Sequence, residues 1–426
     1  MIDEILRQTK KLIPKKLFNA LAPIYHYKLA LLGALIYRFP SRHMRVIAVT
    51  GTKGKSSTTE MLNSIFEAAG QKTAVLNTIR FKVGEESKPN LRKMTVPGRF
   101  FVQHFIRRAV EAHCDVVILE LSSEAAKQFR HKFIDLDALI FTNLSPEHIE
   151  SHGSFEKYRS AKLSLAKALA KSHKKRTVLV ANADDKASEY FLACGADENY
   201  TFSLRDVGGY TTNEYSISFI FKNIKITSPL LGLFNLYNLL GAATCASAFG
   251  ISPEKIKEGL EKLETIKGRV EFIKTNNPKQ NFDVVVDYAH TSGSLEALYK
   301  TFEGRRKICV LGNTGGGRDK WKRPEMASVA DMYCDDVILT NEDPYDEDPK
   351  KIIDDMLPGF KNRKVTMIMD RRAAINEALR QAQTKPNSVV LITGKGTDPF
   401  IMGADGEKIP WSDERVAKEE LEKILK

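Results

Sequence analysis

The stretch that decides the fold is Thr50-Gly51-Thr52-Lys53-Gly54-Lys55-Ser56-Ser57. It follows a short apolar run at residues 45–50 and precedes a segment with helical spacing at residues 57–70. A glycine-rich turn between a strand and a helix is the context of a phosphate-binding loop. Its glycines let backbone N–H groups converge on phosphate oxygens, and the helix N-terminus adds a favourable partial charge. We therefore expect this loop to bind ATP through Gly51, Thr52, Lys53, Gly54, Lys55, Ser56 and Ser57.

Two residues of the loop have distinct expected roles. Lys55 should reach the β- and γ-phosphates, and Ser56 should hold Mg²⁺. The full phosphate-loop spacing would place another glycine at position 49, where this chain has Val49, so a tight strand–helix turn is the alternative. A Mg·ATP site also needs a carboxylate at the end of a strand. Glu120 follows the apolar run that begins at residue 115 and is the candidate.

Outward from the loop, short apolar runs alternate with longer segments of helical spacing, which predicts βαβ units and a mostly parallel sheet. We predict an α/β protein with a short helical N-terminal segment (1–44), a P-loop central domain with a parallel sheet (45–275) and a Rossmann-like α/β C-terminal domain (282–426). Residues 200–229, rich in Thr, Tyr, Ser and Ile, are expected to be antiparallel. The polar stretch 274–281 is expected to be a linker.

Charge and cysteine content indicate which kinds of partner and which cellular compartment to expect. The chain has 65 Lys and Arg against 53 Asp and Glu, and the net charge of +12 favours anionic partners such as nucleotides. The five cysteines are far apart and form no CxxC pair, so neither a disulfide framework nor a zinc ribbon is predicted. We expect a cytoplasmic protein in a reducing compartment.

The positive charge is concentrated near the N-terminus. Residues 1–44 contain eight Lys and Arg residues and only two acidic residues. The same segment contains an apolar run at 29–37. This run is too short to span a bilayer, which takes about 20 residues, and no small-residue cleavage site follows it. The segment is interpreted as a basic amphipathic helix that touches an anionic membrane or a partner protein, or as a helix that packs on the next domain.

Further motifs follow the loop in order. They are ELSS (120–123), FTNLSPEHIESHG (141–153), YRSAK (158–162), NADD (182–185), GLFNLYN (232–238), GRVE (268–271), DYAHT (287–291), GGGRDK (315–320) and GKGTD (394–398). Together the motifs resemble the Mur ligases, ATP-dependent amide ligases that extend the peptide of bacterial cell-wall precursors. DYAHT, GGGRDK and the GKG block are most similar to the MurE-type branch, which adds the third peptide residue.

The resemblance implies a reaction and its catalytic residues. A substrate carboxylate would attack the γ-phosphate of ATP, and an amine would then displace phosphate from the acyl phosphate. The implied cofactors are ATP and Mg²⁺, and the implied partners are a cell-wall peptide precursor and an amino acid, with no nucleic acid. Glu120 and His148 would hold a second Mg²⁺, and Lys162 would be a carbamylated metal-side ligand, although by residue type alone it is a plain helix lysine. The implied catalytic set is Lys55, Glu120, His148 and Lys162.

The resemblance also implies binding residues. Asn235 and Asn238, at i and i+3, would place both amides on one helix face toward the adenine. The full set of further nucleotide contacts is Asn143, Asn235, Asn238, Arg269, Asp287, Tyr288 and His290. The acyl substrate would meet Thr95, Ser123 and Arg130, with a surface role for Arg130 as the alternative. The incoming amino acid would meet Arg318, Asp343, Tyr345, Gly394 and Asp398.

Three departures from the family pattern concern the substrates. About 44 residues precede the loop, too few for the domain that binds the UDP end of the substrate in family members. Asp343-Pro344-Tyr345 stands where enzymes specific for meso-diaminopimelate carry Asn-Pro-Arg, so the arginine partner of the distal carboxylate is absent. Thr397 and Asp398 replace a His-Glu pair.

These departures leave the substrates open. The acidic stretch 342–348 favours an amino acid with a terminal ammonium, such as lysine or ornithine, or forms a solvated loop. The alternatives for function are another acid–amino-acid ligase of the superfamily, such as a pseudomurein peptide ligase or a folylpolyglutamate synthetase, and a non-catalytic ATP-binding subunit.

Overall fold

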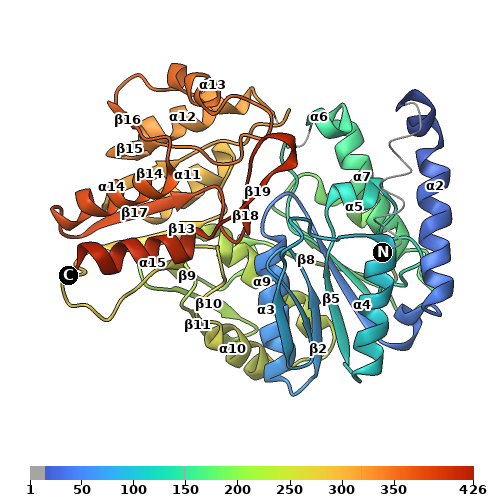
Figure 1. Ribbon diagram of the computed structural model, residues 1–426. Coiled ribbons are helices and arrows are strands. Elements are labelled where there is room, and N and C mark those ends of the chain that lie inside the picture. Colours follow the sequence, from blue (N-terminus) through green and yellow to red (C-terminus); the bar gives the residue numbers. More distant parts are fainter. Residues whose placement is uncertain (1–14, 148, 318) are drawn as a thin grey trace. The chain divides into compact units, whose positions relative to one another are not determined.

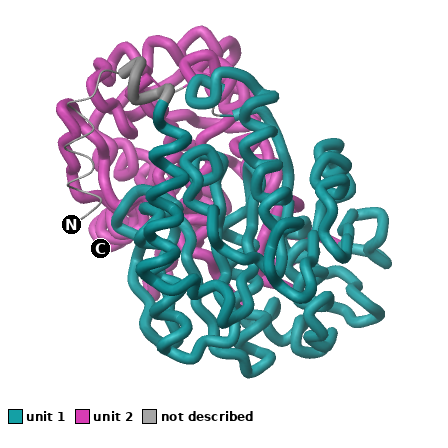
Figure 2. The backbone as a smooth tube through the Cα atoms, turned by 90° about the vertical axis from the view of Figure 1, so that its right-hand side faces the viewer, with its two compact units in different colours: residues 1–210, 218–227, 235–262 teal, residues 211–217, 228–234, 263–426 magenta. Residues whose placement is uncertain are grey.

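The computed structural model describes residues 15–147, 149–317 and 319–426. These residues form two compact units, which Figure 2 shows in teal and magenta. Unit 1 comprises Met1–Tyr210, Ser218–Thr227 and Asn235–Lys262, as far as these are described, and unit 2 comprises Thr211–Ile217, Ser228–Phe234 and Leu263–Lys426. The expected α/β class is confirmed, with a parallel-containing sheet in each unit.

Unit 1 is built on an eight-stranded sheet in the order β4-β3-β2-β5-β1-β6-β7-β8. Strands β2, β5, β1, β6, β7 and β8 are parallel, and β3 and β4 are antiparallel at one edge. The central strands are apolar along their whole length because helices cover both of their faces. The strands are β1 (Arg45–Thr50), β2 (Thr73–Leu76), β3 (Arg80–Val83), β4 (Glu86–Pro89), β5 (Val116–Glu120), β6 (Ala138–Phe141), β7 (Val178–Asn182) and β8 (Glu198–Phe202).

Helices lie on both faces of this sheet (Figure 1). Apolar residues of α4 (Arg99–Glu111) and α7 (Phe155–Leu169) share one core cluster with alternate residues of β1, β5, β6 and β7. On the other face lies α3 (Lys55–Ala68), which contacts β1, β2 and β5. The remaining helices of unit 1 are α5 (Ser123–Lys127), α6 (Ile149–His152), α8 (Ser188–Leu192), α9 (Leu233–Ala248, whose first two residues belong to unit 2) and α10 (Pro253–Lys262).

The N-terminal segment contains one long helix, α2 (Lys15–Ile36), followed by a short 3₁₀ turn, η1 (Pro40–His43). Helix α2 packs on α4, and this contact matches the interpretation of the segment as a helix docked on the next domain. Gly33 lies at the contact, because a Cβ there would already be 3.6 Å from the main chain of Arg99 and Phe100. Within the described part of the chain, none of the helices has the length and apolar character needed to cross a bilayer.

Unit 2 holds a six-stranded sheet in the order β12-β13-β17-β14-β15-β16, in which only β12 pairs antiparallel. One core cluster involves α11 (Ser292–Thr301) and α12 (Lys322–Tyr333), and a second involves α14 (Arg371–Gln383) and α15 (Asp413–Ile424). The strands are β12 (Glu271–Phe272), β13 (Asp283–Asp287), β14 (Arg306–Leu311), β15 (Asp336–Leu339), β16 (Val365–Met367) and β17 (Ser388–Thr393). Short elements complete the unit: α13 (Pro349–Asp354), η3 (Leu357–Gly359), η4 (Ala404–Gly406) and the pair β18 (Phe400–Met402) and β19 (Lys408–Pro410).

The structure corrects two expectations drawn from the sequence. The stretch 274–281 is not a linker between units but the hairpin loop that joins β12 to β13 inside unit 2, and unit 1 ends at Lys262. Polar residues and proline are common to linkers and turns, so composition alone did not separate them. Residues 200–202 belong to parallel β8. The separate sheet after them is β11-β10-β9, formed by β9 (Tyr210–Thr212), β10 (Ile217–Phe221) and β11 (Ile224–Ser228), with η2 (Leu204–Asp206) before it.

The structure also contains one disulfide bond, between Cys309 and Cys334. Cys309 lies in β14, and Cys334 follows the last turn of α12. The two cysteines are 25 residues apart in the sequence, but the chain returns along α12 and brings their Cα atoms to 6.2 Å. The expectation of unpaired cysteines was therefore wrong for this pair, because spacing along the chain does not measure distance in a fold. Cys114, Cys194 and Cys245 are free thiols.

Candidate active site

The phosphate loop joins the end of β1 to the start of α3 in the way that the sequence predicted. Gly51 has a φ of 149° and Gly54 a φ of 81°, both in the region that favours glycine. Space is equally restrictive at both positions. A Cβ at Gly51 would lie 1.9 Å from Thr142 Oγ1, and one at Gly54 would lie 2.1 Å from Asn238 Oδ1. Glycine is therefore required at both ends of the turn.

Side chains from two other elements hold the loop in place. Asn143 Oδ1 accepts a hydrogen bond from Lys53 N at 2.9 Å, and Asn143 Nδ2 donates to Lys53 O at 3.2 Å. Thr142 Oγ1 donates to the same carbonyl at 2.7 Å. From α7, the Tyr158 hydroxyl lies 2.9 Å from Thr52 Oγ1. The loop is thus fixed by the polar residues that follow β6 and by α7.

The predicted metal-side pair, Ser56 and Glu120, is in direct contact. Ser56 Oγ donates to Glu120 Oε2 at 2.8 Å, and the main-chain N–H of Thr78 donates to the same oxygen at 2.8 Å. Both side chains are buried, Ser56 in the first turn of α3 and Glu120 at the end of β5. Thr78 Oγ1 in turn lies 2.9 Å from Thr95 Oγ1, which brings an expected acyl-substrate residue close to the pair.

Lys162 is a buried ionisable group of unit 1. It is fully buried on α7, and its Nζ donates to the main-chain oxygen of Gly51 at 2.5 Å. Burial, followed by repulsion from the Lys55 ammonium, holds the pKa of Lys162 well below its ordinary value, although Glu147 and Glu120 act in the opposite direction. A surface lysine is therefore ruled out, and Lys162 lies near Lys55 and Glu120 as the resemblance implied.

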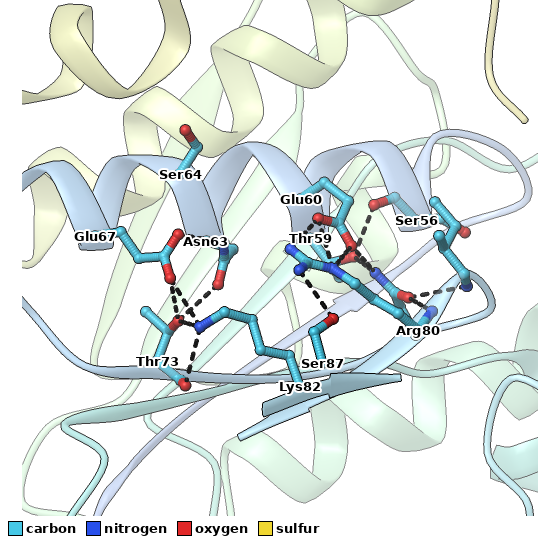
Figure 3. Close-up of polar contacts among 12 residues, drawn as sticks. Ser56, Thr59, Glu60, Asn63, Ser64, Glu67, Thr73, Arg80, Lys82 and Ser87 are labelled. Carbon is cyan, nitrogen blue, oxygen red and sulfur yellow. Dashed lines mark hydrogen bonds and ion pairs between the residues drawn. The ribbon is translucent and has the colours of Figure 1, made fainter. Parts of the chain in front are cut away.

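Polar contacts also fix the far side of α3 (Figure 3). Glu60 accepts hydrogen bonds from Arg80 Nε at 2.9 Å and from Arg80 Nη2 at 2.5 Å, so the pair is bidentate. One turn further along, Thr73 Oγ1 donates to Asn63 at 2.6 Å and accepts from Lys82 at 2.8 Å. These contacts tie the helix that carries Lys55 and Ser56 to β2 and β3.

Asn235 and Asn238 share one face of α9, as their spacing predicted. Asn238 Nδ2 donates to Asn235 Oδ1 at 3.1 Å, and both residues are buried. Asn238 Oδ1 also accepts from Thr58 Oγ1 at 3.4 Å and is the group that a side chain at Gly54 would strike. Asn238 therefore supports the phosphate loop directly. A contact of either amide with adenine stays a prediction.

The two remaining acyl-substrate residues are held by near neighbours. Ser123, at the start of α5, lies 3.2 Å from His152 Nε2. Arg130 hydrogen-bonds to the main-chain oxygen of Val96, next to Thr95, and to Gln128 Oε1 at 2.8 Å. Thr95, Ser123 and Arg130 thus all lie in unit 1: Thr95 between β4 and α4, Ser123 at the start of α5, and Arg130 just after α5.

In unit 2, the expected nucleotide residues form a cluster at the end of β13. Asp287 is buried and accepts hydrogen bonds from the main-chain N–H groups of Val270, at 2.8 Å, and Ala289, at 2.7 Å. The Arg269 guanidinium lies 4.4 Å from the centre of the Tyr288 ring, and that ring is 4.8 Å from His290. Asp287 organises the backbone around this aromatic and cationic cluster.

The expected amino-acid residues of unit 2 surround a buried ion pair. Lys395 is fully buried and donates to Asp343 Oδ1 at 2.8 Å, and Asp398 lies 3.5 Å from the same ammonium. Burial raises the pKa of the neighbouring Glu342 carboxyl, which accepts from Thr314 Oγ1 at 2.8 Å. A Cβ at Gly394, where φ is 104°, would be 2.2 Å from Glu342 Oε2.

The acidic stretch 342–348 is therefore not simply a solvated loop. Asp343 is paired with Lys395, and Glu347 is paired with Arg323 at 2.8 Å and with Lys320 at 2.8 Å. Asp348 caps α13, and Asp346 accepts from the main chain of Asp405. Tyr345 has a φ of 52°, and Gly316 lies against its ring.

Two expected site residues, His148 and Arg318, lie outside the described residues. Three contributors were missed. Glu147 forms a 3.1 Å ion pair with Lys53, Tyr158 holds Thr52, and Lys395 neutralises Asp343. Tyr158 could have been found, because it precedes Lys162 by four residues and so shares its helix face. The ion pairs join residues far apart in the sequence, which no local pattern reveals.

Together, a strand-loop-helix phosphate site, a buried Ser–Glu pair at the carboxyl ends of parallel strands and a buried lysine beside them define a P-loop nucleotide-binding enzyme of the α/β class. Comparison with known proteins identifies the family to which this enzyme belongs. Residues 49–246 match the Mur ligase middle domain, and residues 268–396 match the Mur ligase, glutamate ligase domain. The chain belongs to the Mur ligase family and is an ATP-dependent amide ligase.

Curated relatives are similar over most of their length. The chain is 36% identical over 385 residues to UDP-N-acetylmuramoyl-L-alanyl-D-glutamate–2,6-diaminopimelate ligase of Bacillus velezensis, covering 87% of this chain and 77% of that protein. It is 31% identical over 430 residues to a ligase of the same name from Clostridium acetobutylicum, covering 97% of this chain and 86% of that protein. The likeness to MurE-type ligases is thus confirmed.

Solved structures agree on the fold. A structure of a ligase of the same name has a TM-score of 0.60 at 27% identity and covers 90% of this chain and 79% of its own. Folylpolyglutamate synthase of Mycobacterium tuberculosis has a TM-score of 0.69 at 18% identity and covers 87% of this chain and 92% of its own. A pseudomurein peptide ligase of Methanothermus fervidus has a TM-score of 0.60 at 19% identity and covers 89% of this chain and 79% of its own. At these lower identities, the last two share the fold alone.

Proposed function

We propose that this chain joins an amino acid to the carboxylate of a cell-wall peptide precursor through an acyl phosphate, releasing ADP and phosphate. Lys55 and the loop N–H groups would bind the transferred phosphoryl group, whose transition state is stabilised mainly by positioning and charge. In unit 2, Arg269, Tyr288 and His290 would meet the nucleotide. We place the reaction in the cytoplasm because it consumes ATP.

The observation that carries this proposal is the buried Lys162 next to the phosphate loop. A lowered pKa increases the fraction of neutral amine, and the neutral amine is the form that attacks CO₂. The new N–C bond and the loss of one proton leave a carbamate anion on Nζ. Carbamylation therefore places an anion beside Lys55, and the charge of Lys55 then becomes favourable instead of unfavourable.

The donor atoms near the loop suit Mg²⁺. The Ser56 hydroxyl and the Glu120 carboxylate are hard oxygen ligands 2.8 Å apart, and Mg²⁺ is usually bound by one or two carboxylates together with substrate phosphates. No cluster of three His, Cys, Asp or Glu side chains suitable for a metal occurs among the described residues, so phosphate oxygens would have to complete the ligand set. Ser56, Glu120, carbamylated Lys162 and His148 are the proposed ligands, and bound Mg²⁺ would neutralise phosphate charge.

For the substrates, we propose a muramoyl-peptide acid held by Thr95, Ser123 and Arg130, and a diamino acid held by unit 2. The relatives' names specify UDP-N-acetylmuramoyl-L-alanyl-D-glutamate and 2,6-diaminopimelate. The amino-acid side differs here because Tyr345 supplies no positive charge for a second carboxylate. We therefore propose a diamino acid with a terminal ammonium over meso-diaminopimelate, with contacts from Arg318, Asp343, Tyr345, Gly394 and Asp398.

The test is phosphate release from ATP by the full chain with a panel of muramoyl-peptide acids and amino acids. We expect turnover that needs one acid and one amine together, with an amide product of the summed mass less water. Turnover that is indifferent to both substrates would overturn the proposal. Omission of bicarbonate and CO₂ should lower the rate, and restoring them should recover it.

A further inference from the structure

Helix α2 has two unlike faces. Ala30, Gly33 and Ala34 are buried toward α4, and Tyr37 just beyond the helix is 5.4 Å from His104 of α4. Away from this contact, large apolar side chains face solvent. Their exposed fractions are 50% for Leu21, 56% for Ile24, 46% for Tyr27, 47% for Leu32, 54% for Leu35 and 52% for Ile36.

The exposed positions form a stripe along the helix. Leu21, Ile24, Leu32 and Leu35 are separated by multiples of three and four residues, which places them on one side of an α-helix. Exposed Lys28 fills the gap between Ile24 and Leu32 on that side. With 22 residues, α2 is about 33 Å long. The exposed apolar residues of the stripe run from Leu21 to Leu35, about 21 Å of the helix axis, with Lys28 among them. An exposed apolar patch of this kind marks an interaction site.

The charge around the stripe is of one sign. The sequence from Lys15 to Met44 contains five Lys and Arg and no Asp or Glu. Beyond α2, Asp135 joins Arg42 of η1, at 3.1 Å, to His173, at 2.8 Å. His173 belongs to the basic loop 171–176, KSHKKR, in which Lys171 and Lys175 are exposed. A second cationic segment is therefore adjacent to the end of the helix.

We propose that α2 docks on an anionic lipid surface, lying in the plane of the interface. An interfacial helix of this kind buries its apolar face at the boundary of headgroups and acyl chains and binds anionic lipids through its basic residues. Lys28 can do both, because its aliphatic stem lies along apolar surface while its ammonium reaches a phosphate. Tyr27 is an aromatic side chain suited to the same depth.

Charge favours lipid over a second copy of the chain. Pairing two copies through the stripe would bring Lys28 of each toward the other helix, with no acid between residues 15 and 44 to compensate. An anionic bilayer supplies compensating charge for Lys28, whereas Arg42 is already paired with Asp135. Each basic side chain near such a surface contributes about fivefold in affinity at moderate salt.

The test is co-sedimentation of the full chain with vesicles of phosphatidylcholine alone or mixed with phosphatidylglycerol. We expect binding to the mixed vesicles that weakens in high salt, and much weaker binding to the neutral ones. Leu35→Glu should lower the partition coefficient by about tenfold or more, because a leucine loses its place in the apolar layer. Met332→Glu is the matched control, since Met332 on α12 is a comparably exposed apolar residue (67%).

The possible outcomes distinguish an anionic lipid surface from a second copy of the chain as the partner of the exposed face of α2. Equal binding to both vesicle types, equal loss in the two variants, or no binding at all overturns the proposal. Concentration-dependent self-association that Leu35→Glu abolishes, without vesicle binding, would assign the face to a second copy. Melting temperatures of both variants verify that they are folded. Ligase turnover without vesicles should be unchanged in Leu35→Glu, so failure here is distinguishable from failure of the proposed reaction.

Discussion

Lys162 Nζ donates a 2.5 Å hydrogen bond to the main-chain oxygen of Gly51, which joins the middle of α7 to the first residue of the phosphate loop. If this amine becomes a carbamate, its removal should remove an anion that the reaction needs. We expect Lys162→Ala to lose nearly all ligase activity. Short-chain carboxylic acids should restore part of it, because a free carboxylate can occupy the vacated space with poorer positioning.

Lys167→Ala is the control for this experiment, since Lys167 lies on the same helix but is exposed. It should keep its turnover and show no response to added acid. Near-normal activity of Lys162→Ala would contradict the assignment. So would an equal effect of formate or acetate on wild type and variant.

The lowered pKa of Lys162 also predicts how stability depends on pH. In the unfolded chain this lysine has its ordinary pKa of 10.5. Between the lower folded pKa and 10.5 the unfolded chain binds more protons, so the stability of the wild type rises with pH in this window. Lys162→Met lacks this group. We expect the free energy of unfolding of Lys162→Met, relative to that of the wild type, to fall as pH rises toward 10.5. Urea titrations in CO₂-free buffers measure this difference. A difference that does not vary with pH would argue against a depressed pKa of Lys162.

Lys55 should matter for catalysis far more than for folding. Its Nζ donates to Thr52 O at 2.9 Å within a partly exposed loop, a contact of small structural value. We expect Lys55→Ala to abolish ATP-dependent ligation while changing the free energy of unfolding by less than about 1 kcal/mol. Lys225→Ala, at an exposed position of β11, should change neither. A large fall in melting temperature with intact activity per folded molecule would overturn this view.

The amino-acid preference can be tested at Tyr345. We expect kcat/KM to be higher for lysine or ornithine than for meso-diaminopimelate, and Tyr345→Arg to shift the preference toward meso-diaminopimelate by adding a partner for its distal carboxylate. Asp343 should be left in place, because its loss would leave the buried Lys395 ammonium without that carboxylate. Tyr345→Lys is a control for charge without the planar fork. A wild-type preference for meso-diaminopimelate or for a neutral amino acid would refute the prediction.

The Cys309–Cys334 bond predicts a thiol count. Denatured, unreduced protein should present three reactive thiols, those of Cys114, Cys194 and Cys245, and reduced protein should present five. Closing a loop of 25 residues should stabilise the fold by about 3.5 kcal/mol. Replacing Cys309 and Cys334 by alanine should therefore lower the melting temperature more than Cys194→Ala. Five thiols in the unreduced, freshly purified protein would contradict the bond.

Much of the fold and of the loop site could be predicted because local signals were strong. The apolar runs around Thr50 and Glu120 have the length and composition of buried parallel strands, and Gly51 and Gly54 mark a turn that few other residues allow. Lys162 was harder. By residue type it is a surface lysine, and its register after Tyr158 within a family motif was the signal that pointed to a position near the phosphate loop.

The remaining features depend on long-range contacts. The 274–281 hairpin resembles a linker in composition, since both need polar residues and a proline. The Cys309–Cys334 pair and the Lys395–Asp343 ion pair are formed by residues that the topology of unit 2 brings together. The exposed face of α2 was only half predicted, because a basic, amphipathic pattern indicates an interfacial helix but does not show which side α4 covers.

Gly51 and Thr142 constrain each other's evolution. The Thr142 hydroxyl occupies the space of a Cβ at position 51 and also holds the loop through Lys53 O. An alanine at 51 could be accommodated only if Thr142 were shortened first, and that step would itself release the loop. Either order of substitution passes through an impaired intermediate, so positions 51 and 142 should change only together. The glycine that follows β1 thus limits which residues can replace the threonine that follows β6.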